Sequence, residues 1–182
     1  MSSNNSHQQE QLALNLIREI PDFPAPGIIF KDVTPILKDA EAFASVIEDI
    51  ASFSEGFDLV AGIEARGFIL AAAVAGYTGK GFVPIRKSGK LPYKTYSESY
   101  GLEYGTDTLE IHQDAVLPGE RVLLLDDVLA TGGTLKAASK LIERCGGTID
   151  SAVVLLEIPG LEGKSKYNQE FPHVRVNTVF PE

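Results

Sequence analysis

Two adjacent carboxylates followed by a small, glycine-centred turn form the stretch of this sequence best suited to chemistry. The stretch reads VLLLDDVLATGGTLKAA over residues 122–138, and Asp126 and Asp127 stand where its apolar run ends. The turn that follows consists of Ala130, Thr131, Gly132, Gly133 and Thr134. Its glycines permit positive φ and close backbone approach, and its threonines add hydroxyl donors. With the unpaired N–H groups of a following helix, this turn predicts a cup for a phosphate-sized anion.

The two carboxylates have the wrong charge to bind that phosphate. Asp126 and Asp127 can instead accept hydroxyl groups or help to hold a metal ion. A phosphate at one end and hydroxyl groups near two acids together describe a ribose 5-phosphate. The plain alternative is an ordinary junction between a strand and a capped helix. A nucleotide-binding loop of the G-x-x-x-x-G-K-[ST] type is absent from the sequence.

The elements around this turn predict where it lies. Val122 to Leu125 is a short, continuous apolar run, which favours a strand buried on both faces. From Thr134 the apolar residues adopt helical spacing, and Gly146 and Gly147 end the pattern. In open α/β sheets, ligands bind at the carboxyl ends of the strands, so the turn is predicted at that edge.

A basic cluster is predicted to reach the same edge. Arg86, Lys87, Lys90 and Lys94 fall within nine residues after an apolar run, and Arg66 follows another. Cations placed there could neutralise an anionic leaving group and stabilise the charge that develops in the transition state. The alternative is a solvated charged loop, which has most weight for Lys94.

The remaining patterns predict an α/β fold, a three-layer sandwich with a mostly parallel central sheet. Helical spacing covers Gln11–Ile20, Asp39–Ser54 and Phe68–Gly76. Further buried strands are expected at Leu59–Ile63, Phe82–Ile85, Leu109–Ile111 and Ala152–Leu156.

Length and composition indicate one domain, residues 1–182, with a core of ordinary size. The formal net charge of −9 argues against general nucleic-acid affinity and requires any basic site to be local. Cys145 is the only cysteine, which excludes an intramolecular disulfide and fits a reducing cytoplasm. We expect no membrane span and no signal peptide, and we expect Met1 to Gln9 to be a mobile tail.

The connection from Ser88 to Thr108 is long for a compact domain and rich in Gly, Ser and Tyr. Loops of this length are often functional lids. If the ligand is an activated ribose, its transfer passes through an oxocarbenium-like state that water would intercept, by analogy with glycoside chemistry. We therefore predict that this segment is a flexible lid loop that closes over the site and excludes water.

Several stretches together resemble a known family. The segment from Val122 to Thr134 is similar to the phosphoribosyl pyrophosphate motif of type I phosphoribosyltransferases. Four further pieces resemble adenine phosphoribosyltransferases, namely IPDFP with PGIIFKD near the amino terminus, EARGF at 64–68, RK with GKLP at 86–92, and LEYG with LEI at 102–111. Each piece is modestly specific, whereas the ordered set, from about Ile20 to Leu161, is highly specific.

The resemblance implies the type I phosphoribosyltransferase fold, a homodimer, and transfer of 5-phosphoribose from phosphoribosyl pyrophosphate to adenine with Mg²⁺. Phe30 would stack on the adenine ring, and the backbone of Ile29 and Lys31 would read its edge. Glu103, on the lid, would manage a proton on the purine. Arg66 would act in catalysis and, with Arg86, Lys87 and Lys90, bind pyrophosphate.

The resemblance also assigns roles to the two adjacent carboxylates and to the turn that follows them. Asp126 and Asp127 would hold the ribose hydroxyls directly or through Mg²⁺. The resemblance does not decide which of the two lies nearer the metal. Ala130 to Thr134 would hold the 5-phosphate. The peptide bond between Glu64 and Ala65 would be the family's cis bond.

Alternatives remain for these roles. Phe30 could be core packing, and Glu103 could be a surface carboxylate. The acceptor could be xanthine, guanine or hypoxanthine, or the protein could be a non-enzymatic sensor of phosphoribosyl pyrophosphate.

Overall fold

The computed structural model describes residues 12–23, 25–101 and 105–181. The chain divides into two compact units, Met1–Asp49 and Ile50–Glu182, which are described one at a time. The expectation of a single domain stays a prediction, and the tail predicted at Met1 to Gln9 lies outside the described residues. No helix within the described ranges is long and apolar enough to cross a membrane.

The first unit is built on a two-stranded hairpin. Strand β1 (Arg18–Pro21) pairs antiparallel with β2 (Ile29–Asp32), and the short helix α2 (Thr34–Lys38) follows. The helix predicted over Gln11–Ile20 is therefore wrong in its second half, since helical residues occupy only 12–15 of the described part. Pairing with β2 overrides the helical spacing of the apolar residues there. Helix α3 (Ala40–Ser52) forms where a helix was predicted.

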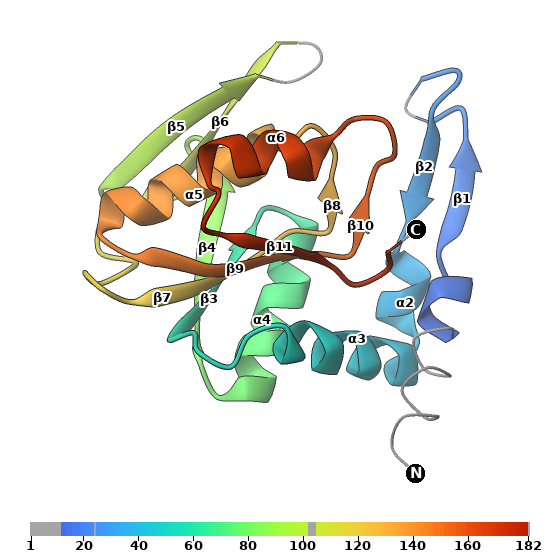
Figure 1. Cartoon of the computed structure of the whole chain (residues 1–182), viewed down its shortest axis with the longest axis horizontal. Coiled ribbons are helices and arrows are strands. Elements are labelled where there is room, and N and C mark those ends of the chain that lie inside the picture. The colour runs from blue at the N-terminus through green and yellow to red at the C-terminus, as the bar shows by residue number, and fades with distance from the viewer. Residues whose placement is uncertain (1–11, 24, 102–104, 182) are drawn as a thin grey trace. The chain divides into compact units, whose positions relative to one another are not determined.

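The second unit contains a seven-stranded mixed sheet in the order β11-β9-β7-β3-β4-β6-β5 (Figure 1). Its strands are β3 (Leu59–Ile63), β4 (Gly81–Lys87), β5 (Thr95–Gly101), β6 (Thr106–His112), β7 (Arg121–Leu125), β9 (Thr148–Val154) and β11 (Arg175–Thr178). The five strands from β11 to β4 run parallel, whereas β6 and β5 are antiparallel additions.

Helices cover both faces of this sheet. Helix α4 (Arg66–Thr78) lies on one face, and α5 (Gly133–Cys145) and α6 (Gly163–Glu170) lie on the other (Figure 1). The predicted three-layer α/β sandwich is thereby confirmed. A two-residue parallel pairing of β8 (Val128–Leu129) with β10 (Leu156–Glu157) stands apart from the main sheet.

Helix α5 supplies much of the core because its apolar residues share one face. Leu135, Ala138, Leu141 and Ile142 are buried against the strands, with the spacing of an amphipathic helix. Each fully buried leucine or isoleucine side chain contributes roughly 1.5–3 kcal/mol of transfer free energy. The helix ends at Gly146, whose positive φ of 95° is the usual left-handed stop. The core therefore fixes the direction of α5, and with it the loop that precedes α5.

The segment predicted as a lid loop, Ser88–Thr108, is largely regular, and in this respect the prediction is wrong. It contains β5 and the beginning of β6, which pair from Thr95↔His112 to Gly101↔Thr106. The stretch TYSESYG alternates, so that Tyr96 and Tyr100 both pack against the core. Arg144 of α5 stacks over the Tyr96 ring with its Cζ 4.6 Å from the ring centre. Glu103 lies outside the described residues.

Candidate active site

The carboxyl ends of three strands meet at one edge of the sheet. In the parallel register Ile63 of β3 faces Ile85 of β4, and Gly62 faces Leu125 of β7. The residues that follow these strands therefore begin side by side, as the sequence predicted for the basic cluster and the two carboxylates. This edge is also where ligands bind in open α/β sheets.

The turn Ala130–Thr134, from here on the phosphate loop, forms one wall of a pocket. The pocket has a volume of about 240 Å³. It is lined by Asp126, Val128, Leu129, Ala130, Thr131, Gly132, Thr134, Leu135, Val154 and Leu161. Gly132 has a φ of 84°, and no side chain within the described ranges caps the start of α5. The N–H groups of the first turn of α5 can therefore serve an anion.

The two adjacent carboxylates have different surroundings. The Asp127 side chain is only 9% exposed, and its Oδ2 lies 2.5 Å from Nε of Arg66 in an ion pair. Asp126 is half-buried and lines the pocket. Burial and the negative charge of Asp127 raise the pKa of Asp126 well above its ordinary value. Asp126 thus faces a ligand in the pocket, whereas Asp127 holds Arg66.

Arg66 reaches Asp127 because α4 begins directly against the end of β7. A Cβ atom at Gly67 would lie 2.9 Å from the carbonyl oxygen of Leu125, so a larger residue would push the helix away. The Glu64–Ala65 peptide bond just before the helix is cis, which confirms the expectation for this turn. The Arg66 side chain remains 38% exposed, so it can contact a bound anion while paired with Asp127.

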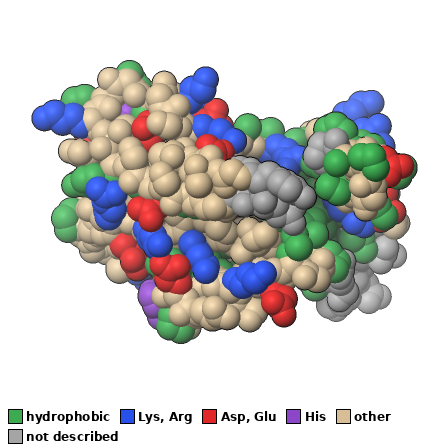
Figure 2. Space-filling model, turned by 90° about the horizontal axis from the view of Figure 1, so that it is seen from above, with side chains coloured by type: hydrophobic (Ala, Val, Ile, Leu, Met, Phe, Trp, Pro, Cys, Tyr) green, Lys and Arg blue, Asp and Glu red, His purple; other side chains and the backbone are tan. Residues whose placement is uncertain are grey.

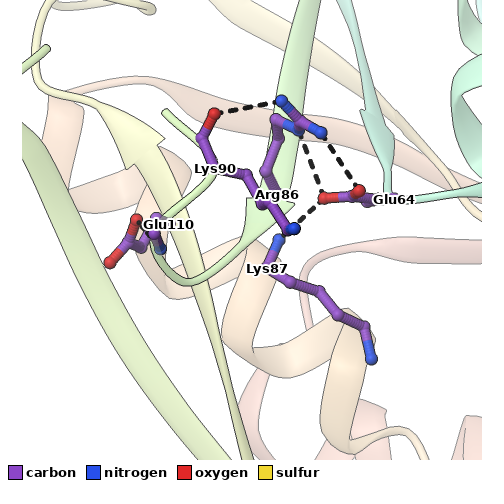
Figure 3. Close-up of polar contacts among 6 residues, drawn as sticks. Glu64, Arg86, Lys87, Lys90 and Glu110 are labelled. Carbon is purple, nitrogen blue, oxygen red and sulfur yellow. Dashed lines mark hydrogen bonds and ion pairs between the residues drawn. The ribbon is translucent and has the colours of Figure 1, made fainter. Parts of the chain in front are cut away.

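The basic turn at Arg86–Lys90 is held by acidic side chains of neighbouring elements. Figure 3 shows the Glu64 carboxylate accepting hydrogen bonds from Nε and Nη2 of Arg86 and from the backbone N–H of Lys87, at 3.0–3.2 Å. Arg86 also donates to the carbonyl of Lys90 at 3.0 Å. Glu110 accepts hydrogen bonds from the Ser88 hydroxyl and the backbone N–H of Gly89. This turn is therefore fixed before any ligand binds.

The side chain of Lys87 extends away from Glu64 (Figure 3) and pairs with Asp107 of β6 at 2.7 Å. This contact raises the pKa of Lys87 and, chiefly through the same hydrogen bond, lowers the pKa of Asp107. The Tyr100 hydroxyl lies 3.4 Å from Asp107 Oδ2 and also hydrogen-bonds the Thr134 side chain. The β5–β6 hairpin is thus linked to both the basic turn and the phosphate loop.

We expect Glu64→Gln to lower the free energy of unfolding near pH 7 by about 1–2 kcal/mol, because Arg86 and Lys87 lose a charged acceptor. The hydrogen bonds from Arg86 lower the pKa of Glu64 below its ordinary value of 4.5. A lowered pKa contributes stability that is complete above the ordinary value and is lost as pH falls through the folded-state pKa. The difference between wild type and variant should therefore shrink below about pH 4.5.

Urea unfolding at about pH 7 and about pH 3 measures this difference. Glu143→Gln, an exposed carboxylate on α5, is the matched control and should change little at either pH. An equal loss of stability at both pH values would contradict the assigned role of the Glu64 charge.

The residues predicted to bind a base lie in the first unit, on β2. The Ile29 side chain is largely exposed, and the ring of Phe30 meets that of Phe23 edge to face at 5.2 Å. Lys31 forms an ion pair with Glu19 across the β1–β2 hairpin. This pair leaves the backbone of β2 as the part of Lys31 able to read a base edge. The base-binding roles of these residues stay predictions.

Some residues at the site were missed in the sequence. Glu64 and Asp107 hold two of the predicted cations, and Val154 and Leu161 line the pocket. Glu64 could have been found, since an acid that ends one parallel strand stands beside the arginine that ends the next. Leu161 lacked such a signal because it follows the phosphate loop by about thirty residues in a segment where no site was predicted.

Acidic side chains are not concentrated on the face shown in Figure 2, where Lys and Arg side chains are interspersed with Asp and Glu. Surface ion pairs of the second unit include Lys140 with Glu170 at 2.8 Å and with Glu98 at 3.6 Å. Such exposed pairs contribute little stability, about 0–1 kcal/mol each. The net charge of −9 is therefore compatible with a local site for a polyanion.

Comparison with known proteins gives a consistent result. The model of the phosphoribosyl transferase domain family matches residues 31–179. An adenine phosphoribosyltransferase from Thermoanaerobacter sp. (strain X514) is 58% identical over 153 residues, which cover 83% of this chain and 88% of the relative.

Solved structures of adenine phosphoribosyltransferases have the same fold as this chain. The adenine phosphoribosyltransferase of Thermoanaerobacter pseudethanolicus superposes with a TM-score of 0.87 at 52% identity, covering 93% of this chain and 98% of that one. The Saccharomyces cerevisiae enzyme, solved with an imino-altritol bisphosphate and adenine, gives a TM-score of 0.88 at 33% identity and covers 96% of this chain and 99% of that one.

Proposed function

This chain belongs to the phosphoribosyl transferase family, among its adenine phosphoribosyltransferases, and from that premise we propose how its own residues carry out the reaction. The reaction transfers 5-phosphoribose from phosphoribosyl pyrophosphate to adenine and gives AMP and pyrophosphate, a step of purine salvage. The observation that carries our assignment is the pocket between the phosphate loop and Asp126, with the Asp127–Arg66 ion pair directly beside it.

The ribose 5-phosphate end of the substrate belongs in this pocket. The N–H groups of the phosphate loop and the first turn of α5, with the hydroxyls of Thr131 and Thr134, bind the 5-phosphate. Asp126 lines the same pocket and accepts hydrogen bonds from the ribose hydroxyls. Asp127 contributes indirectly, since its buried carboxylate fixes the direction of the Arg66 guanidinium.

The cations at the sheet edge receive the pyrophosphate. Arg66 pairs with Asp127, the neighbour of the pocket-lining Asp126, and the basic turn adds Arg86, Lys87 and Lys90. They stabilise the negative charge that grows on pyrophosphate as its bond to the ribose breaks. Glu64 and Asp107 hold Arg86 and Lys87 in place, so these cations need little reorganisation during the reaction.

We also propose that Mg²⁺ takes part, bound mainly through the substrate. The Asp126 carboxylate that lines the pocket is a hard oxygen donor suited to this ion, whereas Asp127 is committed to Arg66. When bound, Mg²⁺ would offset charge on the pyrophosphate oxygens. Within the described ranges, no group of three or more His, Cys, Asp or Glu side chains is placed to hold a metal ion by itself.

Adenine is proposed to stack on Phe30 while the backbone of Ile29 and Lys31 reads its edge. Glu103 then manages the proton on the purine nitrogens as the new bond to the ribose forms. The β5–β6 hairpin, which carries Glu103 between its two strands, serves as the lid that excludes water from the oxocarbenium-like centre. The docking of Tyr100 beside Thr134 supports this placement of the hairpin.

A turnover assay tests the function directly. Purified protein receives Mg²⁺, phosphoribosyl pyrophosphate and one base at a time, from adenine, hypoxanthine, guanine, xanthine and uracil. AMP formed from adenine alone supports the proposal. Turnover of an oxo-purine instead would retain the ribose-phosphate site and overturn the base pocket. Binding of phosphoribosyl pyrophosphate without any product would favour the non-enzymatic sensor.

A reducing, cytoplasmic compartment is further proposed from the cysteine content. Cys145 is the only cysteine of the chain, and its thiol is half-buried, where burial raises its pKa. A thiol of this kind is a poor nucleophile and behaves as a small apolar residue.

We propose a homodimer formed through α4. This helix reads RGFILAAAVAGYT and is apolar on nearly all sides, although only Gly67, Leu70, Ala71, Val74 and Ala75 are buried. Its other face leaves Ile69, Tyr77 and smaller residues exposed, and Phe82 of β4 adds to it. A helix that is apolar all round is normally buried, so a second copy of this surface is the expected cover.

We expect Ala72→Glu, in the middle of that exposed face, to convert the dimer to a monomer, because each copy would bury a new unpaired charge. Light scattering coupled to size-exclusion chromatography measures the mass, and a shift from about twice the chain mass of 19.6 kDa to one chain mass is the expected result. Ser165→Glu, on the exposed face of α6, is the matched control and should leave the mass unchanged. A dimer that persists in Ala72→Glu would exclude this surface as the interface.

A further inference from the structure

The phosphate loop touches a segment for which the sequence predicted no site. Helix α6 begins at Gly163, and a Cβ atom there would overlap the carbonyl oxygen of Ala130 and lie 2.8 Å from Cγ of Leu129. In the opposite direction, a Cβ atom at Gly132 would lie 2.9 Å from the carbonyl oxygen of Gly163. The two backbones are thus as close as a pair of glycines allows.

The chain makes a sharp turn to achieve this approach. Glu162, directly before α6, has a φ of 55°, a left-handed conformation that non-glycine residues rarely adopt. The backbone N–H of Lys164 donates to Glu157 Oε1 at 3.0 Å, and the N–H of Ile158 donates to the Leu129 carbonyl at 2.9 Å. The turn is therefore fixed from the β8–β10 side.

The rest of α6 is anchored to α5, the helix that the phosphate loop opens. Tyr167 is fully buried, and its hydroxyl lies 2.8 Å from the Ser139 hydroxyl in the middle of α5. Its ring stacks on Phe171 with ring centres 5.1 Å apart, and Glu170 pairs with Lys140 at 2.8 Å. The phosphate loop is consequently enclosed between the end of β7, the start of α5 and the start of α6.

We propose that Gly163 is a positioning residue for the reaction, because the first turn of α6 sets the curvature of the phosphate loop from behind. The N–H groups that bind the 5-phosphate take their direction from this curvature, and no side-chain cap within the described ranges supports it instead. Displacement of a substrate-holding group by about 1 Å can reduce an enzyme's rate on the order of 100-fold. The inference rests on the proposed role of the phosphate loop.

Gly163→Ala tests this contact, and Gly81→Ala is its matched control. Gly163 does not have a positive φ, so alanine there changes sterics rather than backbone preference, and an added Cβ at Gly81 meets open space among the described residues. We expect Gly163→Ala to raise KM for phosphoribosyl pyrophosphate and Kd for ribose 5-phosphate on the order of 10-fold or more. KM for adenine and Kd for pyrophosphate should stay at the wild-type values, as should every constant of Gly81→Ala.

Tyr167→Phe keeps the ring but removes the hydroxyl bonded to Ser139. This variant tests the positioning role of α6 if Gly163→Ala fails to fold. If the hydrogen bond holds the loop in its binding conformation, its loss should raise KM for phosphoribosyl pyrophosphate by about two- to tenfold, again without change for adenine. Unchanged constants, or equal changes for both substrates, would overturn the proposal. Failure of the wild type to convert adenine would instead contradict the proposed function, and ribose 5-phosphate binding would still test the loop.

Discussion

Arg66→Ala is expected to reduce kcat/KM for phosphoribosyl pyrophosphate by about 10²–10³-fold, the largest kinetic loss among the cations at the site. Arg66 is the cation next to the pocket, and Asp127 fixes its guanidinium from behind at 2.5 Å. A preorganised cation stabilises charge as it develops on the leaving group, so its loss should appear mainly in kcat. Steady-state kinetics with both substrates varied measures the effect.

The same substitution also leaves a carboxylate without its counter-ion. Since the Asp127 side chain is 9% exposed and that of Arg66 is 38% exposed, we expect a loss of about 1–2 kcal/mol in unfolding free energy rather than the 3–5 of a fully buried pair. The double variant Arg66→Ala with Asp127→Asn should regain most of this stability but none of the activity. Recovery of activity in the double variant would show that Arg66 serves folding only.

Glu103→Ala is expected to lower kcat by about 10²–10⁴-fold, with little change in KM for either substrate, because proton management contributes only as the bond forms. Glu103 itself lies outside the described residues. The described residues that flank it carry the argument, since Tyr100 pairs with Asp107 across the hairpin and hydrogen-bonds Thr134 at the phosphate loop. Glu103 falls between these two strands in the sequence, which supports its proposed place on the lid.

Glu98→Ala on β5 is the matched control, since Glu98 is an acid of the same hairpin that pairs with Lys140 of α5 at 3.6 Å. We expect its kcat to stay within about twofold of the wild type. The pH dependence of kcat should lose a limb in Glu103→Ala and keep it in Glu98→Ala. A normal kcat in Glu103→Ala would return Glu103 to the role of a surface carboxylate.

The parts of the fold that the sequence predicted well are those with strong local patterns. β3 occupies Leu59–Ile63 as predicted, and β7 and α5 differ from the expected bounds by one residue. Their apolar runs and glycine stops are local signals. The β5 strand was missed because TYSESYG is polar on one face and its two tyrosines reach the core only after β6 pairs with it. Such a strand depends on tertiary contacts rather than on its own composition.

The residues of the candidate site also divide into those with a local sequence signal and those without one. The phosphate loop, the two aspartates and the basic cluster were visible because their residue types follow strand ends directly. Gly163 was not, since its importance comes from a contact with Ala130 and Gly132 across about thirty residues of chain. Which of Asp126 and Asp127 is the more buried likewise depends on α4 packing against β7, which two identical neighbouring letters cannot reveal.

The buried hydroxyl pair between α5 and α6 has a consequence at alkaline pH. Burial raises the pKa of Tyr167 to about 12, against an ordinary value of 10.0, so the folded protein keeps this phenol protonated where an unfolded chain would ionise it. The folded state therefore loses stability as pH rises from about 10 towards about 12. Because the chain has six tyrosines and no tryptophan, the rise in near-ultraviolet absorbance on phenol ionisation follows these six side chains. Burial also raises the pKa of Tyr100, so the late phenolate that disappears in Tyr167→Phe is the one that reports on the contact between α5 and α6.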